Sequence, residues 1–153
     1  MAATPDGLGR LFNVVHDADG VGIKLVDGTA VTFVSFLADG SQTMVLTQRD
    51  STGVKSEIDL NVFGLDPENL GSRVYAGPAT GGSWTEVTSS SSGNDVDGSD
   101  ATNDTLVVTI RAEQLADGYD TVEATSATGS VTAILHDLTV QRKPSNLRSV
   151  VVA

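Results

Sequence analysis

Two histidines are the residues of this sequence best suited to catalysis or metal binding. His16 lies in VVHDADG and His136 in ILHDL, so each precedes an aspartate. Neighbouring side chains on a strand point to opposite faces, and we therefore expect neither His-Asp pair to hydrogen-bond internally. His136 is expected to be a hydrogen-bonded residue of the core or of an interface. A metal site shared by both histidines would need at least one further ligand, and the sequence indicates none.

An acidic segment between Ser89 and Asp104 is the second candidate site. Counted from Asp95, positions six and twelve of an EF-hand loop fall on Asp100 and Leu106, where that loop needs glycine and a bidentate glutamate. A weak calcium site of another kind stays open. We expect an exposed, mobile loop, because a segment with a single valine buries too little apolar surface to offset its ordering entropy.

Other kinds of chemistry have no matching residues. The chain has no cysteine, which excludes disulfides and thiolate metal sites. The serines from 89 to 92 lack a base partner, and glycines such as Gly20, Gly28 and Gly118 follow aspartates, as in turns. The sequence therefore predicts a protein that is not an enzyme, with no catalytic, cofactor-binding or metal-binding residues.

Composition limits the partners of the chain. Its 153 residues suggest one domain, and its net charge of -11 argues against binding nucleic acid. No run approaches the roughly 18 apolar residues of a membrane span, and the first residues show no secretory signal, so we expect synthesis in the cytoplasm and no membrane partner. From Leu138 to Ala153 there is no acidic side chain. A basic tail on an acidic body could dock on an acidic neighbour, although a disordered end is the simpler alternative.

Short runs of β-branched residues between turn signals predict strands. The segments 21–26, 30–38 and 43–49, separated by Asp-Gly pairs, predict a three-stranded meander. Residues 56–63 alternate with a period of two, and segments 73–76 and 83–88 predict a hairpin in which Trp84 packs against the body. Leu106, Val108 and Ile110 share one face of another strand, and residues 112–115 could form one helical turn.

The last predicted elements are a long hairpin and a valine-rich tail. Residues 119–125 and 130–140 are expected to pair around Ala127–Gly129, with Ile134, His136, Leu138 and Val140 on one face. Pro144 ends this strand. The final valines could pair with another chain's sheet edge or within this domain, and both alternatives stay open.

These elements predict an all-β fold, a β-sandwich or β-barrel with one long acidic loop and extended termini. We expect an N-terminal arm over residues 1–20, a β domain over 21–141 that contains the flexible loop 89–104, and a basic C-terminal tail over 142–153.

Two blocks of the sequence resemble a known group of proteins. They are GRLFNVVHDADGVGIKLVDGTAVTFVSF, residues 9–36, and DGYDTVEATSATGSVTAILHDLTVQRKPSNLRSV, residues 117–150. Both resemble small proteins encoded near the capsid genes of tailed phages, the head decoration (cement or minor capsid) group, especially of actinobacterial hosts. The segment HDLTVQRKPSNLR is the more specific part, and residues 50–104 carry no resemblance.

The resemblance implies a virion protein on the capsid surface that binds the major capsid protein and other copies of itself, for example as a trimer. Such a protein would stabilise the shell through contacts made only after assembly. We expect these contacts at both ends of the chain, at Leu8, Leu11, Phe12, Arg142, Lys143, Leu147 and Arg148.

Two alternatives remain beside this interpretation. One is a phage tail tube or neck protein, because tube subunits are also rich in β-structure. The other is a carbohydrate-binding β-sandwich module, for which Trp84, Tyr75 and Tyr119 are the candidate aromatic residues.

Overall fold

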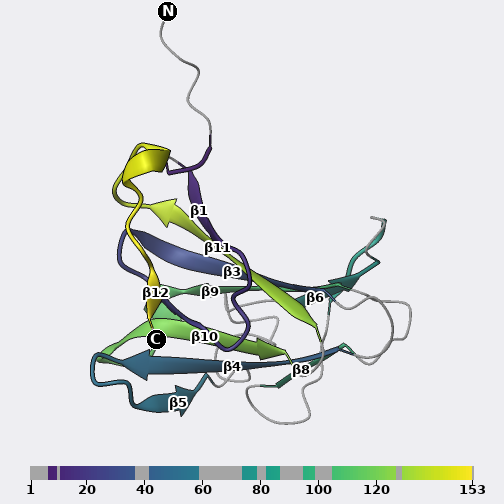
Figure 1. Ribbon diagram of the computed structural model, residues 1–153. Coiled ribbons are helices and arrows are strands. Elements are labelled where there is room, and N and C mark those ends of the chain that lie inside the picture. The colour runs from purple at the N-terminus through teal and green to yellow at the C-terminus, as the bar shows by residue number, and fades with distance from the viewer. Residues whose placement is uncertain are drawn as a thin grey trace, which may run out of the picture.

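The computed structural model describes residues 7–9, 11–36, 42–58, 74–78, 82–86, 95–98, 105–126 and 129–152. They form two antiparallel β-sheets, so the predicted all-β, sandwich-like fold is confirmed (Figure 1). The only helical elements within the described residues are two 3-10 turns, η1 (Ala112–Gln114) and η2 (Pro144–Asn146). The first agrees with the predicted single turn after residue 111.

The first sheet, sheet A, has the strand order β1-β11-β3-β9-β6-β7. Its strands are β1 (Phe12–Val15), β11 (Ser130–Leu138), β3 (Gly28–Phe36), β9 (Thr105–Arg111), β6 (Val74–Gly77) and β7 (Thr85–Glu86). The pair β6–β7 is the hairpin predicted around residues 77–82.

The second sheet, sheet B, has the order β12-β2-β10-β4-β5, and one further strand, β8, also pairs with β4. Its strands are β12 (Val151–Val152), β2 (Gly22–Lys24), β10 (Tyr119–Ser126), β4 (Gln42–Asp50), β5 (Lys55–Glu57) and β8 (Asp95–Gly98).

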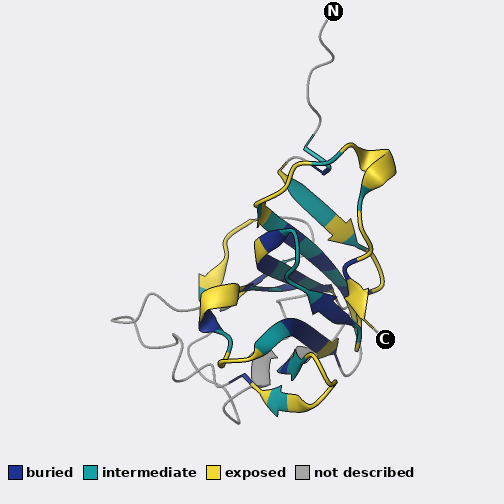
Figure 2. Cartoon of the chain, turned by 90° about the vertical axis from the view of Figure 1, so that its left-hand side faces the viewer, coloured by how far each residue is buried: buried dark blue, intermediate teal, exposed yellow. Residues whose placement is uncertain are grey.

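The core lies between the sheets and follows the period-two patterns of the sequence. Leu106, Val108 and Ile110 of β9, which were predicted to share one face, are all buried. Phe33 and Leu46 are among the largest fully buried side chains. Figure 2 shows buried positions in the middle of the strands and exposed positions at η2 and other connections. Each fully buried aliphatic or aromatic side chain contributes about 1.5–3 kcal/mol to folding.

The predicted meander over residues 21–49 is wrong. β2 and β4 lie in sheet B, whereas β3 lies in sheet A. Asp27-Gly28 therefore connects two sheets and is not a hairpin turn. A Cβ at Gly28 would lie 2.8 Å from the carbonyl oxygen of His136, so this glycine permits close packing of the chain against β11.

The predicted hairpin of residues 119–140 is also wrong, because β10 belongs to sheet B and β11 to sheet A. At the end of the connection between them, a Cβ at Gly129 would lie 2.6 Å from the carbonyl oxygen of Phe36. The hydroxyl of Ser126 accepts a hydrogen bond from the Gly129 N–H at 3.0 Å. Both glycines thus allow the chain to cross between sheets where a tight turn was expected.

Both ends of the chain differ from the predicted arm and tail. Residues 12–15 form β1, which pairs with β11, while residues 1–6 lie outside the described residues. At the other end, β12 pairs with β2 and Val150 is buried in the core, so the final valines pair within the domain. Of the predicted acidic loop, Asp95–Gly98 is strand β8, because backbone pairing needs no apolar side chains; residues 89–94 and 99–104 lie outside the described part.

Candidate interaction surfaces

The outward side of sheet A is a continuous surface of mainly uncharged side chains, termed the apolar face. Strand register aligns these side chains in four rows that run across the sheet. The rows are Phe12–His136–Ala30–Arg111, Val14–Ile134–Thr32–Thr109, Thr132–Val34–Val107–Tyr75 and Ser130–Phe36–Thr105–Gly77.

Several large side chains of the apolar face are open to solvent. Val14 and Phe36 are each 41% exposed, and Tyr75 is 37% exposed. Trp84 is 47% exposed, and its ring lies over Gly77, where an added Cβ would meet the indole at 2.6 Å. A contiguous apolar surface of this kind marks an interaction site more often than scattered exposed residues do.

Three polar groups in the middle of the apolar face bind one another. The Thr32 hydroxyl lies 2.7 Å from the Thr109 hydroxyl and 2.8 Å from Nε2 of His136, so one chain of hydrogen bonds crosses three strands. The prediction that His136 is hydrogen-bonded is therefore confirmed. His136 Nδ1 also lies 3.4 Å from a carboxylate oxygen of Asp137, within ion-pair distance, although neighbouring side chains of a strand were expected to point to opposite faces. Asp137 has a φ of 52°, which takes its side chain out of strand alternation.

Asp137, His136 and Thr32 are connected in the order carboxylate, base and hydroxyl, which is the order of a catalytic triad. Its setting does not support that chemistry. β3 is paired on both sides, with β11 and with β9, so its backbone N–H groups are committed to the sheet and form no oxyanion hole. Thr32 also shares its hydroxyl with Thr109. This group is best understood as internal pairing of polar side chains on a sheet surface.

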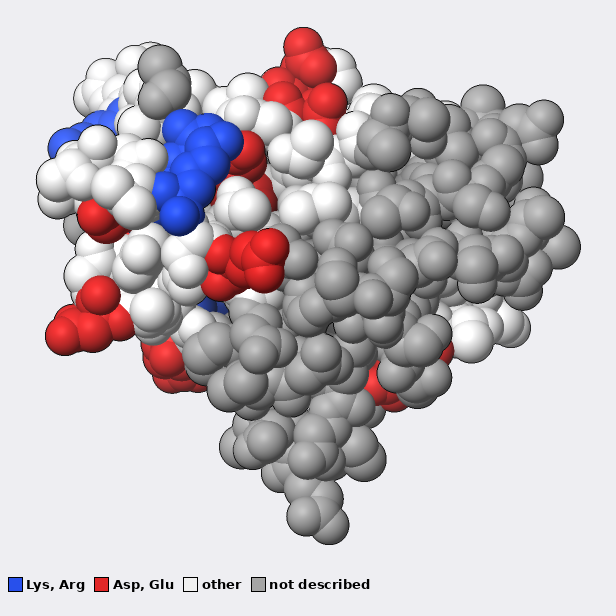
Figure 3. Space-filling view, turned by 90° about the horizontal axis from the view of Figure 1, so that it is seen from below, with Lys and Arg blue, Asp and Glu red and all other residues white. Residues whose placement is uncertain are grey.

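The outward side of sheet B is different and is termed the charged face. Glu123 of β10 has a side chain only 6% exposed, and it pairs with Arg49 of β4 and with Lys55 of β5, whose Nζ lies 2.8 Å from Oε1. At Gly22 of β2, a Cβ would lie 3.0 Å from Cγ2 of Thr121, so this glycine permits close packing against β10. Figure 3, seen from the side of β4 and β5, shows cationic and anionic side chains interspersed.

A second ion pair continues the charged face. Lys24 Nζ lies 3.0 Å from a carboxylate oxygen of Asp120. Partial burial raises the pKa of the Asp120 carboxyl, but the hydrogen bonds from Lys24 and Thr121 outweigh this, and the pKa lies below its usual value. Asp50, in the turn between β4 and β5, also has a lowered pKa, chiefly because the Thr52 hydroxyl donates to it. These hydrogen bonds thus favour the carboxylate forms of Asp120 and Asp50.

Segments from the two ends of the sequence meet at one corner of the molecule, termed the terminal corner: residues 7–9, 11–12 and 142–147. The Arg142 N–H donates to the Gly9 carbonyl at 2.7 Å, and a Cβ at Gly9 would lie 3.2 Å from Leu147. Leu8 forms an isolated bridge with Phe12. Six of the seven predicted contact residues, all except Arg148, therefore lie close together although they come from opposite ends of the sequence.

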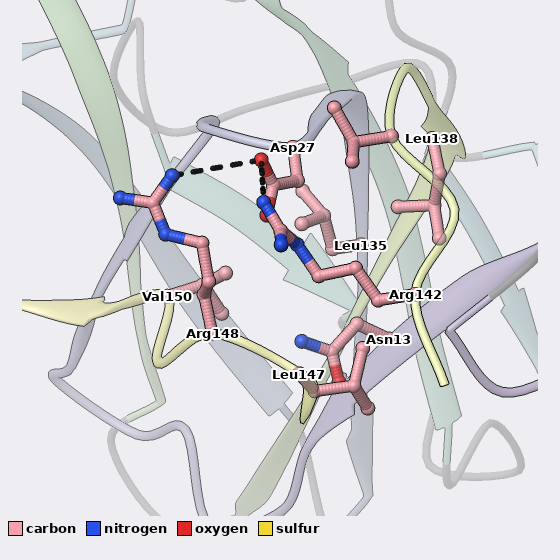
Figure 4. A pocket seen from close by; sticks show the side chains of 9 residues that line it. Asn13, Asp27, Leu135, Leu138, Arg142, Leu147, Arg148 and Val150 are labelled. Carbon is pink, nitrogen blue, oxygen red and sulfur yellow. Dashed lines mark hydrogen bonds and ion pairs between the residues drawn. The ribbon is translucent and has the colours of Figure 1, made fainter. Parts of the chain in front are cut away.

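Asp27 fixes the tail below this corner. Arg142 Nε donates to Asp27 Oδ2 at 2.9 Å, and Arg148 Nη1 lies 3.7 Å from Oδ1 (Figure 4). The Asp27 side chain is 13% exposed. Around it lies a small apolar pocket of about 10 Å³, room for about one water molecule. The pocket is lined by Asn13, Leu135, Leu138, Val140, Leu147 and Val150 together with the three charged residues.

The predicted contact residues therefore differ in what they offer a partner. Leu11 is 68% exposed and Lys143 is also exposed. Arg142 and Arg148, in contrast, already bind Asp27 of the same chain. The role of Asp27 was missed, because its Asp-Gly pair predicts a turn and its partner lies 115 residues away.

Neither histidine contributes to a metal site in the part of the chain that the structure describes. His16 is exposed in the turn after β1. The residue before it, Val15, lies opposite Ala133 of β11. Ala133 is three residues from His136, so the two histidines are separated by about 10 Å along the strand direction. Among the described residues, no group of three or more His, Asp or Glu side chains could hold a metal ion. A second pocket, of about 210 Å³ beside Arg111 and Glu113, is smaller than the roughly 300 Å³ of a typical ligand site.

Comparisons with known protein families, curated proteins and solved structures found no match. Within the described ranges, no helix is long and apolar enough to cross a membrane.

Proposed function

We propose that this protein is a non-enzymatic structural component of a phage particle, which binds the outside of the capsid and stabilises contacts between major capsid subunits. The observation that carries the proposal is the terminal corner. The two blocks that resemble head decoration proteins supply its two halves, and the Gly9–Arg142 hydrogen bond joins them. An exposed leucine beside exposed basic groups is suited to a protein surface that is partly apolar and partly acidic.

The contact would act through binding free energy alone. Because Asp27 already holds Arg142 and Arg148, we assign the direct contacts to Leu11 and Lys143. The arginines then position the corner. A preorganised corner loses less entropy on binding than a free tail would.

The test uses phage heads from a mutant that lacks the gene for this protein. Purified protein is added, and occupancy is measured by co-sedimentation and by cryo-electron microscopy. We expect wild type to decorate the outer surface and Leu11→Asp and Lys143→Glu each to lower occupancy at least tenfold. Val54→Asp is the matched control, because Val54 is 57% exposed in the turn between β4 and β5, far from the corner in the strand order.

Two outcomes would refute the proposal. One is undiminished occupancy of both corner variants. The other is wild-type protein that ignores heads and forms tubes by itself, which would favour a tail tube.

One observation favours a second candidate, glycan binding. Trp84 lies over Gly77, and Tyr75 is the neighbouring outward residue of the same strand, so two exposed aromatic side chains share one end of the apolar face. Sugars stack on such aromatic surfaces. A specific signal in a glycan screen that disappears in Trp84→Ala would support this function.

A further inference from the structure

We propose that the apolar face of sheet A is an interface between two copies of this chain, which pack face to face about a two-fold axis. The inference concerns a different surface from the terminal corner and does not depend on the proposed function. Three properties of the face support it: its charge, its area and the state of its polar groups.

Charge is the first property. The chain has a net charge of -11, so two copies repel over most of their surfaces. The strands of sheet A contain two acidic residues: Asp137, near the end of β11, and Glu86 of the edge strand β7, which lies opposite Tyr75. The strands of sheet B contain six acidic residues: Asp50, Glu57, Asp95, Asp97, Asp120 and Glu123. Of the two sheet surfaces, the apolar face is therefore the one on which a second copy meets fewer carboxylates, and both of them lie near its edges.

Area is the second property. Strands lie about 4.8 Å apart and rise about 3.3 Å per residue, so these five strands cover roughly 500 Å² of sheet. Side chains that stand above the sheet increase the area that a partner can bury. A biological interface should bury at least about 1,000 Å² in total, or about 500 Å² per partner, and the apolar face is large enough for that.

The polar groups are the third property. Burying an unpaired hydroxyl or imidazole would cost about 1–3 kcal/mol. Here the Thr32 hydroxyl joins Thr109 and His136 within one chain, at 2.7 and 2.8 Å. A second copy can therefore cover these three side chains without having to supply hydrogen-bond partners, and in two-fold packing the same surface serves both copies.

The first experiment measures mass by analytical ultracentrifugation over a range of micromolar concentrations. We expect wild type to rise from 15.8 kDa towards twice that mass, and Val14→Asp and Phe36→Asp each to weaken association at least tenfold. Val54→Asp, with a similarly exposed valine outside the face, should dimerise like wild type. Circular dichroism checks that every variant is folded. A wild-type mass that stays at 15.8 kDa, or equal loss in Val54→Asp, would overturn the proposal.

The dependence of association on salt concentration is a second test, because an interface built on ion pairs would respond in the opposite direction. Raising NaCl from about 0.05 to about 0.5 M screens the repulsion between two copies of charge -11, so association should strengthen. An interface built on ion pairs would weaken instead, and that result would contradict the proposal.

Cross-linking locates the contact even if a charged variant fails to fold. The natural chain has no cysteine, so Val34→Cys introduces a single thiol on a middle strand of the apolar face. A bifunctional maleimide should join two copies of Val34→Cys and leave Val54→Cys largely monomeric. Equal cross-linking of the two variants would exclude the apolar face. Loss of dimers with retained binding to phage heads would separate this inference from the proposed function.

Discussion

The two outward surfaces of this sandwich differ in the charge of their side chains and in how far those side chains are paired within the chain. The charged face of sheet B carries ions and satisfies them within the chain, as Glu123 does with Arg49 and Lys55. The apolar face of sheet A carries few ions and leaves Val14, Phe36 and Tyr75 open to solvent. A surface whose charges are mutually paired gains little from a partner, whereas exposed apolar area gains from being covered. The comparison indicates which sheet is suited to solvent and which to contact.

The largest effect is expected at the buried carboxylate of the charged face. Glu123→Gln keeps the shape of the side chain and leaves Arg49, 12% exposed, without its carboxylate. We expect the free energy of unfolding to fall by about 3 kcal/mol, measured by urea denaturation. Asp120→Asn is the matched control, because its pair with Lys24 is about 40% exposed and should contribute less than about 1 kcal/mol. Equal losses would show that burial does not distinguish the two pairs.

The next effect concerns the polar chain within the apolar face. Thr32→Val removes the hydroxyl that joins Thr109 to His136, and we expect a loss of about 1–2 kcal/mol in unfolding free energy. Thr132→Val changes an outward threonine of β11 that does not belong to this chain of hydrogen bonds. It should change stability by less than about 0.5 kcal/mol. If Thr132→Val costs as much, the hydrogen bonds of Thr32 are not what stabilises this face.

A smaller, local effect is expected where the two sheets are joined. Asp27→Asn weakens the pairing with Arg142 and Arg148, and we expect the tail to loosen at a cost of about 1 kcal/mol. Hydrogen exchange should show this at the Lys24 amide, which donates to Val150, while the buried strand β10 keeps its protection. Asp137→Asn, on an exposed carboxylate, is the control and should leave the Lys24 amide unchanged.

The smallest effect is the pH dependence of the exposed ion pair. The pKa of Asp120 is lower in the folded chain than in the unfolded chain, so its contribution is complete above the unfolded pKa of about 3.9 and is lost as pH falls through the folded value. The difference in unfolding free energy between wild type and Asp120→Asn should therefore shrink as pH falls from about 5 to about 2. If this difference in unfolding free energy persists at the lowest pH, the ionised carboxylate of Asp120 is not what stabilises the wild type.

The sequence predicted which side chains face the core better than it predicted which strands pair. Alternation placed Leu106, Val108 and Ile110 on one face of a strand, because a period of two depends only on local backbone geometry, and that face is the buried one. The same alternation is compatible with either sheet, and Asp-Gly at residues 27–28 looked like a turn. In the folded chain, Asp27-Gly28 connects sheet B to sheet A. This connection depends on the packing of Gly28 against β11 and on the pairing of Asp27 with Arg142, which is distant in sequence.

The candidate surfaces were also predicted only in part. Both ends of the chain were chosen as contact segments, and the structure brings them together, but no local pattern shows that Arg142 is held by Asp27. The apolar face was not predicted, since its members come from five strands whose order depends on tertiary pairing. Val34 and Tyr75 become neighbours only through β9, which lies between their strands.

The strand order has a consequence for synthesis on the ribosome. Among the described residues, β1 forms strand pairs only with β11, and β2 only with β10 and β12, so these two strands lack their sheet partners until residues 119–138 have emerged. Long-range pairing of this kind slows folding and leaves apolar strands uncovered for longer. The nascent chain should therefore stay protease-sensitive until late in translation, and a truncated product should fail to accumulate as a half-built sheet.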